Sequence, residues 1–236
     1  MHKFELLPNV LEGVAHRRER KHIFEDFEPA TAALVVVDMQ NFFCVDGQPG
    51  ALPVAREIVP NINRIAAAMR AAGGRVVWIK TTFSEEIAQQ WSTFFDYFNT
   101  PESRARVIGG LSAGAEGHDL YGELDVLPED MIVEKNRYSA FIQGSSDLHD
   151  LLKDRQIDTI LITGTVTTVC CESTARDAAM LNYKTIMVAD GNAAPSDIQH
   201  NVALSNLFGG FCDVLTTSQI VKRLETVAAQ RTRAAE

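Results

Sequence analysis

The sequence lacks a long hydrophobic run, and it lacks an excess of basic residues. No stretch of 18 apolar residues occurs in its 236 positions, so no transmembrane helix is expected. Lysine and arginine total 22 against 31 aspartates and glutamates, which gives a net charge of −9. Nucleic acids and anionic membrane surfaces bind basic faces, so we expect neither as a partner.

Cysteine is scarce, and its spacing excludes the usual structural roles. Cys44, Cys170, Cys171 and Cys212 form neither CxxC metal pairs nor a disulfide framework, so we expect reduced thiols. If a cysteine of this chain has a functional role, we therefore expect that role to depend on the reactivity of its thiol.

A metal-binding pattern and a secretory signal are also missing. The six histidines, at positions 2, 16, 22, 118, 149 and 200, show no ligand spacing, so we predict no catalytic metal and no cofactor. The N-terminal stretch "MHKFELLPNVLEG" lacks the charged-then-apolar order of a signal peptide. We therefore expect a cytoplasmic protein.

The composition that is present is ordinary for a globular protein, with 46% hydrophobic and 22% charged residues, and the chain is long enough to bury a large core. Several short apolar runs are too continuous for half-exposed strands and are typical of strands buried on both faces of a parallel sheet. They span residues 33–37, 75–79, 131–133, 159–162 and 185–188, and a weaker one follows at 212–215.

Helical periodicity fills most of the segments between these runs. We expect helices at 54–72, 146–155, 171–182, 195–207 and 217–229, and Pro60 predicts a kink or a late start in the first of them. Alternating strands and helices predict an α/β fold, namely a single-domain, doubly wound, mainly parallel six-stranded sheet with helices on both faces.

Two segments interrupt the alternation. Residues 1–30 are predicted to form an N-terminal arm, and residues 82–130 to form an insertion within a domain that spans 31–230. Residues 231–236 are predicted to be a C-terminal tail. The insertion carries an aromatic segment at 91–98, and so long a connection is usually a lid, a binding loop or an interface element.

Three side chains of different chemistry follow predicted strands. Asp38 and Lys135 end the first and third strands, and Cys170 comes just after the fourth. Ligands of an open parallel sheet bind at the carboxyl ends of its strands, so an acid, an amine and a thiol are expected at one edge. Each alone is more often structural, as a cap, a solvated charge or a packed thiol, but the three together predict a catalytic site.

This combination suits nucleophilic attack on a carbonyl carbon. A carboxylate can take the thiol proton and later return it to a leaving amine. A helix N-terminus and a nearby ammonium stabilise the thiolate, and the turn before the cysteine can supply N–H donors for an oxyanion. Helical periodicity does not distinguish Cys170 from its neighbour Cys171.

Three blocks of the sequence resemble the isochorismatase-like cysteine hydrolases. They are "VVVDMQNFF", "VEKNRYSAF" and "TGTVTTVCCESTARDA", and the likeness in order and spacing covers residues 33–194. The family includes nicotinamidases, N-carbamoylsarcosine amidohydrolase, ureidoacrylate amidohydrolase and biuret amidohydrolase. The resemblance implies the isochorismatase-like form of the doubly wound fold.

The family pattern Gly-x-x-Thr-x-x-Cys falls on Gly164, Thr167 and Cys170. The resemblance therefore implies that Cys170 is the nucleophile and Asp38 its proton acceptor. It also implies that Lys135 is the partner that stabilises the thiolate.

Around this nucleophile the resemblance implies two backbone features. One is a cis peptide bond between Thr165 and Val166. The other is an oxyanion hole formed by the N–H groups of Val166 and Cys170. Cys171 is then left as a small buried neighbour at the helix–sheet contact.

Departures from the family pattern bear on the substrate. Nicotinamidases usually carry an Asp-x-His metal site after the second strand, where this chain has "IKTTFSEE", and isochorismatases proper tend to lack the cysteine. The resemblance therefore implies C–N bond hydrolysis through a thioester, in a small linear ureido or carbamoyl amide that is like biuret or ureidoacrylate. The alternatives are a nicotinamidase, an isochorismatase-type hydrolase and a non-catalytic small-molecule-binding module.

Residues that adjoin the predicted triad are candidates for substrate binding. Asn41 and Tyr138 can hydrogen-bond an amide or ureide, and Phe42 and Phe141 can exclude water, although core packing is equally expected for Phe141. The predicted set is Gln40, Asn41, Phe42, Tyr138, Phe141 and Thr167. The expected partner is the small amide or ureide substrate. The resemblance and the aromatic segment also imply a homo-oligomer, often a tetramer.

Overall fold

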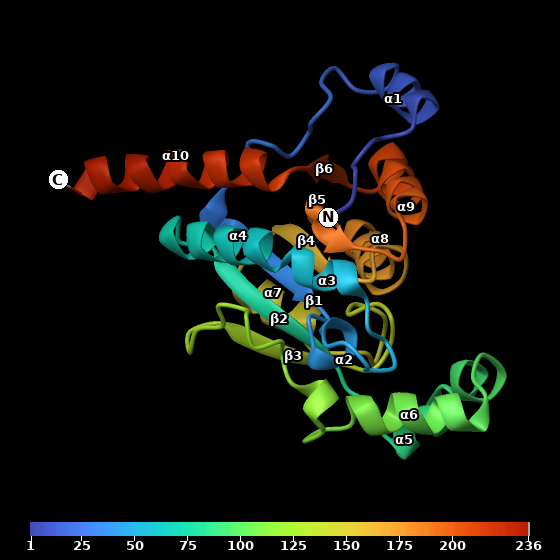
Figure 1. Ribbon diagram of the computed structural model, residues 1–236. Coiled ribbons are helices and arrows are strands. Elements are labelled where there is room, and N and C mark those ends of the chain that lie inside the picture. Colours follow the sequence, from blue (N-terminus) through green and yellow to red (C-terminus); the bar gives the residue numbers. More distant parts are fainter. Residues whose placement is uncertain (236) are drawn as a thin grey trace.

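Six strands form one sheet in which every neighbouring pair runs parallel (Figure 1). The structure is a computed structural model that describes residues 1–235, and residue 236 lies outside the described part. The strands are β1 (Ala32–Val37), β2 (Arg75–Thr81), β3 (Met131–Lys135), β4 (Thr159–Thr165), β5 (Lys184–Ala193) and β6 (Asp213–Leu215). The predicted six-stranded, doubly wound α/β fold is confirmed.

Helices cover both faces of the sheet, because side chains alternate between the faces along each buried strand. Val35 packs with one group of helices and its neighbour Leu34 with the other. The first group is α7 (Leu148–Asp154), α8 (Glu172–Met180) and α9 (Asp197–Gly210), and the second is α3 (Pro53–Glu57), α4 (Val59–Ala71) and α10 (Thr217–Ala235). Figure 1 shows α4 and α10 side by side on their face.

Two of the predicted helices differ from expectation. The helix expected at 54–72 is divided at Ile58 into α3 and α4, and Pro60 lies in the first turn of α4, where its missing N–H leaves no helical bond unmade. The last helix continues to Ala235 instead of ending at 229, so the predicted C-terminal tail, 231–236, is helical as far as it is described. No glycine or proline stops the helix in this stretch.

The strand order β3-β2-β1-β4-β5-β6 reverses direction between β1 and β4. At such a switch point the connections leave the sheet in opposite directions, and the strand ends border a crevice. Gly164 lets β4 approach β1 closely there. Its φ of +115° is a glycine conformation, and a Cβ would collide with the carbonyl oxygen of Val37.

The insertion at 82–130 has a small hydrophobic core of its own. It holds α5 (Glu85–Gln90), α6 (Pro101–Leu111) and short helical turns at Thr93–Tyr97 and Glu116–His118. Phe83 packs edge-on against Phe95 at a centroid distance of 5.1 Å, and Phe42, from the segment after β1, joins the same cluster. Figure 1 shows α5 and α6 to one side of the sheet, on the opposite side from α10. This aromatic core forms a wall beyond the ends of β1 and β2.

The N-terminal arm packs against α9. Its helix α1 (Pro8–Ala15) lies beside α9 in Figure 1. The N–H of Leu7 donates to Ser205 Oγ at 2.9 Å, and His2 stacks on His200 at a centroid distance of 4.4 Å. The arm is thus part of the folded structure. Within residues 1–235, no helix has the length and apolar character needed to cross a membrane.

Candidate active site

Asp38 lies at the first position after β1 and is completely buried. Its φ of +53° is in the left-handed region, which aspartate tolerates better than most residues, and its N–H donates to the carbonyl oxygen of Ile79 at 3.0 Å. The backbone thus turns out of the sheet while it stays bonded to β2. This turn brings the carboxylate to the switch point.

Lys135 ends β3, and its buried ammonium reaches across β2 to Asp38. Lys135 Nζ lies 2.8 Å from Asp38 Oδ2, and both side chains are fully buried. The ammonium also donates to Thr81 Oγ1 at 2.6 Å and to the carbonyl oxygen of Arg137 at 3.0 Å. Asp38 follows β1 and Lys135 ends β3, and β2 lies between these two strands. The position of β2 therefore sets the distance between the two charged side chains.

Thr81 is a residue of this site that the sequence did not reveal. It is the register partner of Lys135, and its hydroxyl accepts from Lys135 while it donates to Asp38 Oδ1 at 2.9 Å. The sequence feature that could have indicated it was the position of Thr81 at the carboxyl end of β2, which lies between β1 and β3. A threonine there has no acid–base chemistry, so its position alone did not mark it.

Cys170 lies in the helical turn Thr167–Cys171 that connects β4 to α8, with Val166 as the residue before the turn. Only 8% of Cys170 is exposed. Burial raises the pKa of its thiol well above the ordinary value, while the charge of Lys135 acts to lower the pKa and that of Asp38 to raise it. Both side chains therefore lie close enough to the thiol to affect its pKa. Cys170 is therefore a neutral thiol at rest, because the nearby ammonium does not offset burial.

The charges around this thiol are arranged for proton transfer. Burial opposes the charge on Lys135, but attraction from Asp38 raises the pKa of Lys135 above its ordinary value, so the ammonium stays protonated. Asp38 Oδ2 faces Lys135 as an ion pair but has no well-aligned hydrogen-bond donor. That oxygen is free to accept a proton from Cys170.

A cavity of about 160 Å³ opens onto the thiol. Its polar lining includes Lys135, Thr81 and Tyr138, and most of the rest is aromatic or aliphatic. The lining residues are Phe42, Phe43, Thr81, Phe83, Phe94, Val107, Leu111, Lys135, Arg137, Tyr138, Val166, Val169 and Cys170. Four of its apolar residues, Phe83, Phe94, Val107 and Leu111, come from the insertion, so that segment forms one side of the candidate site.

Two of the predicted substrate-binding residues, Phe42 and Tyr138, line this cavity. Tyr138 is 37% exposed and meets Trp91 edge-on at a centroid distance of 4.9 Å. Phe43, Phe83 and other aromatic residues of the wall were not named by the sequence reasoning. Of the aromatic wall residues, only Phe94 lies in the aromatic segment at 91–98.

Gln40, Asn41 and Thr167 do not line the cavity, and their role in substrate binding stays a prediction. The buried amide of Gln40 donates to the carbonyl oxygens of Thr81 and His118, at 3.1 and 2.9 Å, and accepts from the N–H of Thr81 at 2.8 Å. Gln40 therefore anchors the end of β2.

The side chains of Asn41 and Thr167 also bond within the protein. Asn41 Nδ2 donates to the carbonyl oxygen of Glu116 at 2.9 Å, which ties the start of the segment after β1 to the insertion. Thr167 is completely buried, and its Oγ1 lies 3.0 Å from Nδ1 of His200. Both residues therefore shape the surroundings of the cavity without facing it.

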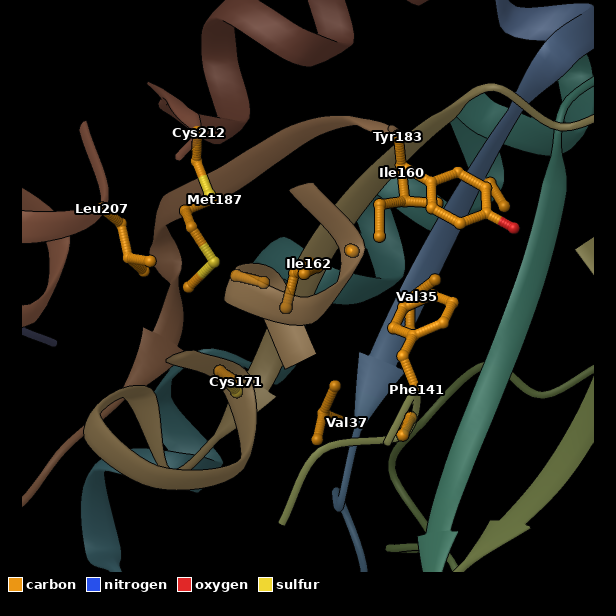
Figure 2. Packing of buried hydrophobic residues seen from close by; sticks show 14 of the residues in the cluster. Val35, Val37, Phe141, Ile160, Ile162, Cys171, Tyr183, Met187, Leu207 and Cys212 are labelled. Carbon is orange, nitrogen blue, oxygen red and sulfur yellow. The ribbon is translucent and has the colours of Figure 1, made fainter. Parts of the chain in front are cut away.

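Phe141 belongs to the hydrophobic core and does not line the cavity, so its role in substrate binding stays a prediction. Its ring packs on Tyr183 at a centroid distance of 5.4 Å, and Figure 2 shows it close to Val35 among the buried residues. The loop after Lys135 folds back onto the sheet. Tyr138 and Phe141 therefore point to different sides.

The peptide bond between Thr165 and Val166 is cis. This is the bond at which the resemblance implied a cis peptide. Val166 and Cys170 both line the cavity.

Cys171 occupies a different environment from Cys170. It is completely buried in the main hydrophobic core, and Figure 2 shows it near Ile162 and Val37. We expect Cys171→Ala to lower the free energy of unfolding by about 1 kcal/mol, through the loss of buried contacts, and to leave hydrolysis unchanged. Urea unfolding and a rate assay of the same preparation measure the two effects. A large loss of rate without unfolding would assign the chemistry to Cys171 instead.

Among residues 1–235, no group of three or more histidine, cysteine, aspartate or glutamate side chains is placed to hold a metal ion. His118 is buried, and its Nε2 lies 2.7 Å from Thr82 Oγ1, just after β2.

Comparison with known proteins places these residues in context. The model of the isochorismatase domain matches residues 32–219, which contain all three blocks that carry the resemblance. A solved cysteine hydrolase from Pseudomonas syringae pv. phaseolicola is similar at 28% identity and a TM-score of 0.79, over 89% of this chain and 100% of that one. An isochorismatase-like hydrolase from Alkaliphilus metalliredigens is 30% identical, with a TM-score of 0.68 over 81% and 98%. N-carbamoylsarcosine amidase from Thermoplasma acidophilum is 28% identical, with a TM-score of 0.62 over 79% and 96%.

Proposed function

The chain belongs to the isochorismatase family of hydrolases, and on this basis we propose that it is a cysteine amidohydrolase that cleaves a C–N bond of a small linear amide, of the ureido or carbamoyl type. One observation carries the proposal. The thiol of Cys170 opens onto a buried cavity together with Lys135, which is the ion-pair partner of Asp38. A thiol, a proton acceptor and a fixed positive charge are what thioester formation from an amide requires.

In the first step Asp38 accepts the thiol proton at Oδ2, and Cys170 Sγ attacks the carbonyl carbon. Because burial raises the pKa of the thiol, the proton leaves as the S–C bond forms instead of beforehand. The carbonyl oxygen becomes an oxyanion that the N–H groups of Val166 and Cys170 stabilise. Lys135 keeps its proton and offsets the negative charge on Asp38 and the sulfur.

The tetrahedral intermediate then collapses with rupture of the C–N bond. The leaving nitrogen takes the proton from Asp38 and departs as ammonia or an amine, which leaves a thioester on Cys170. Water next gives a proton to Asp38 as it adds to the thioester carbon. The C–S bond breaks, and the proton returns to the thiol.

Two observations support a small carbamoyl substrate. The cavity of about 160 Å³ is smaller than the 300–1,000 Å³ that is usual for sites of drug-sized ligands. N-carbamoylsarcosine amidase, which the chain resembles at 28% identity over 96% of its length, acts on a carbamoyl compound by its name.

Ammonia release tests the proposal against its rivals. The panel is biuret, ureidoacrylate, N-carbamoyl amino acids and nicotinamide, with isochorismate turnover followed separately. We expect a linear ureido or carbamoyl compound to be cleaved with a kcat/KM of about 10⁴ M⁻¹ s⁻¹ or more. Preference for nicotinamide would favour a nicotinamidase, and turnover of isochorismate that does not need Cys170 would favour a vinyl-ether hydrolase. No turnover, with equally slow alkylation of every cysteine, would favour the binding module.

A further inference from the structure

Arg137 lies where the candidate site meets the surface. It lines the inner cavity together with Cys170, and with Tyr138 it also lines an outer cavity of about 440 Å³. The outer cavity is bordered by Trp91, Arg137, Tyr138, Ser139, Ile142, Ser173, Arg176, Asp177 and Met180. Arg137 and Tyr138 therefore border both cavities.

The guanidinium of Arg137 has neutral partners. Its Nη1 donates to the carbonyl oxygen and to Oδ1 of Asn136, both at 2.9 Å, and its Cζ lies 5.3 Å from the ring centroid of Trp91. Among residues 1–235, no carboxylate forms an ion pair with it. By contrast, Arg176 pairs with Glu172 and Arg104 with Glu85. Other arginines of the described residues, such as Arg64, also form no ion pair, and Arg137 differs from them because it lines the inner cavity.

The other positive charge at the cavity already has partners. Lys135 forms an ion pair with Asp38 and donates to Thr81 and to the carbonyl oxygen of Arg137, so a carboxylate already compensates its charge. The hydrogens on Nε and Nη2 of Arg137 have no acceptor among the described residues. Arg137 is therefore the positive group of this cavity that can bind a ligand.

The apolar wall of the cavity makes the positive charge of Arg137 selective for an anionic group. Phe42, Phe83, Phe94 and Leu111 are apolar, so an anion that enters has no water to stabilise it and needs a paired cation. A guanidinium offers a planar pair of N–H donors that match the two oxygens of a carboxylate. Trp91 holds the guanidinium in place by a cation–π contact without neutralising it.

We propose that Arg137 binds a carboxylate carried by the substrate, so that the amide cleaved at Cys170 belongs to an acid, as in an N-carbamoyl amino acid. This inference rests on the proposed function, because it takes the inner cavity as the substrate site. It selects acidic ureido compounds over neutral ones such as biuret. The apolar wall contacts the carbon chain that separates the carboxylate from the scissile carbonyl.

Alkylation with a matched pair of reagents tests the charge preference without knowledge of the substrate. Iodoacetate and iodoacetamide both form an S–C bond as the C–I bond breaks and iodide leaves, and they differ in a carboxylate against a neutral amide. We expect Cys170 to react faster with iodoacetate than with iodoacetamide. Arg137→Gln should lower the ratio of the two rate constants by about 10- to 100-fold, the range for loss of a hydrogen bond to a charged group. Mass spectrometry of the peptide that holds Cys170 gives both rate constants.

Arg176→Gln is the matched control, because Arg176 borders the outer cavity, is paired with Glu172 and does not line the inner one. It should leave the ratio unchanged, and Arg137→Lys should restore part of the preference. A ratio that Arg137→Gln does not change would overturn the carboxylate site. Failure of the proposed function would give a different result. Cys170 would then react no faster than Cys44 with either reagent, whatever the ratio of the iodoacetate and iodoacetamide rate constants.

Discussion

Cys170→Ala is expected to lower the rate of amide hydrolysis by about 10⁴-fold or more, because it removes the atom that forms the thioester. The loss should appear in kcat and should not depend on which amide of the panel the parent protein cleaves. Ammonia release at saturating substrate measures it. Mass spectrometry of the parent protein, quenched during turnover, should show an acyl group on the peptide that holds Cys170, and the variant should show none.

Two controls separate lost chemistry from lost structure. Cys171→Ala removes a sulfur atom from the adjacent position, where the side chain is completely buried in the core, and should leave the rate unchanged. Cys170→Ala itself should unfold in urea within about 1 kcal/mol of the parent, since the thiol is small and borders a cavity. Hydrolysis that survives intact in a folded Cys170→Ala variant would exclude the thioester mechanism. A vinyl-ether hydrolase would then be the better hypothesis for the function.

The fold and the convergence at its switch point could be predicted from the sequence because each rests on a regular pattern. Continuous apolar runs marked the strands, and parallel strands place their carboxyl ends at one edge. Asp38 and Lys135 needed only their positions at strand ends to be brought together. The choice between Cys170 and Cys171 did not follow from periodicity, since the turn before α8 is not yet a regular helix.

The cavity wall was harder to predict, because adjacency in the sequence does not fix which way a side chain points. Gln40 and Phe42 are two residues apart, yet the first bonds to the end of β2 and the second lines the cavity. Tyr138 and Phe141 diverge in the same way. Arg137 stood in the "VEKNRYSAF" block, but only the fold reveals that it lacks an acidic partner. Tertiary contacts decide these positions, and no local pattern encodes them.

Lys135→Met is expected to lower the free energy of unfolding by about 3–5 kcal/mol, because it leaves the carboxylate of Asp38 buried without its counter-charge. Asp38→Asn should cost a similar amount by leaving Lys135 unpaired. The double variant should recover most of this stability, since neither charge is then buried alone. None of the three should hydrolyse the substrate. Urea unfolding at neutral pH gives the free energies, and ammonia release gives the activity.

The Lys184–Asp158 ion pair is the matched control for this effect. Its N–O distance is also 2.8 Å, but about half of each side chain is exposed, so Lys184→Met should cost no more than about 1 kcal/mol. The dependence of folding stability on pH should also reflect the charge of Lys135. Because the folded state raises the pKa of Lys135, its stabilisation is complete below the ordinary lysine pKa and is lost as pH rises through the folded value. The deficit of Lys135→Met should therefore shrink in strongly alkaline solution. Equal costs for the buried and the exposed pair would show that burial does not govern the Asp38–Lys135 interaction, and the role of that pair as a fixed charge beside the thiol would have to be abandoned.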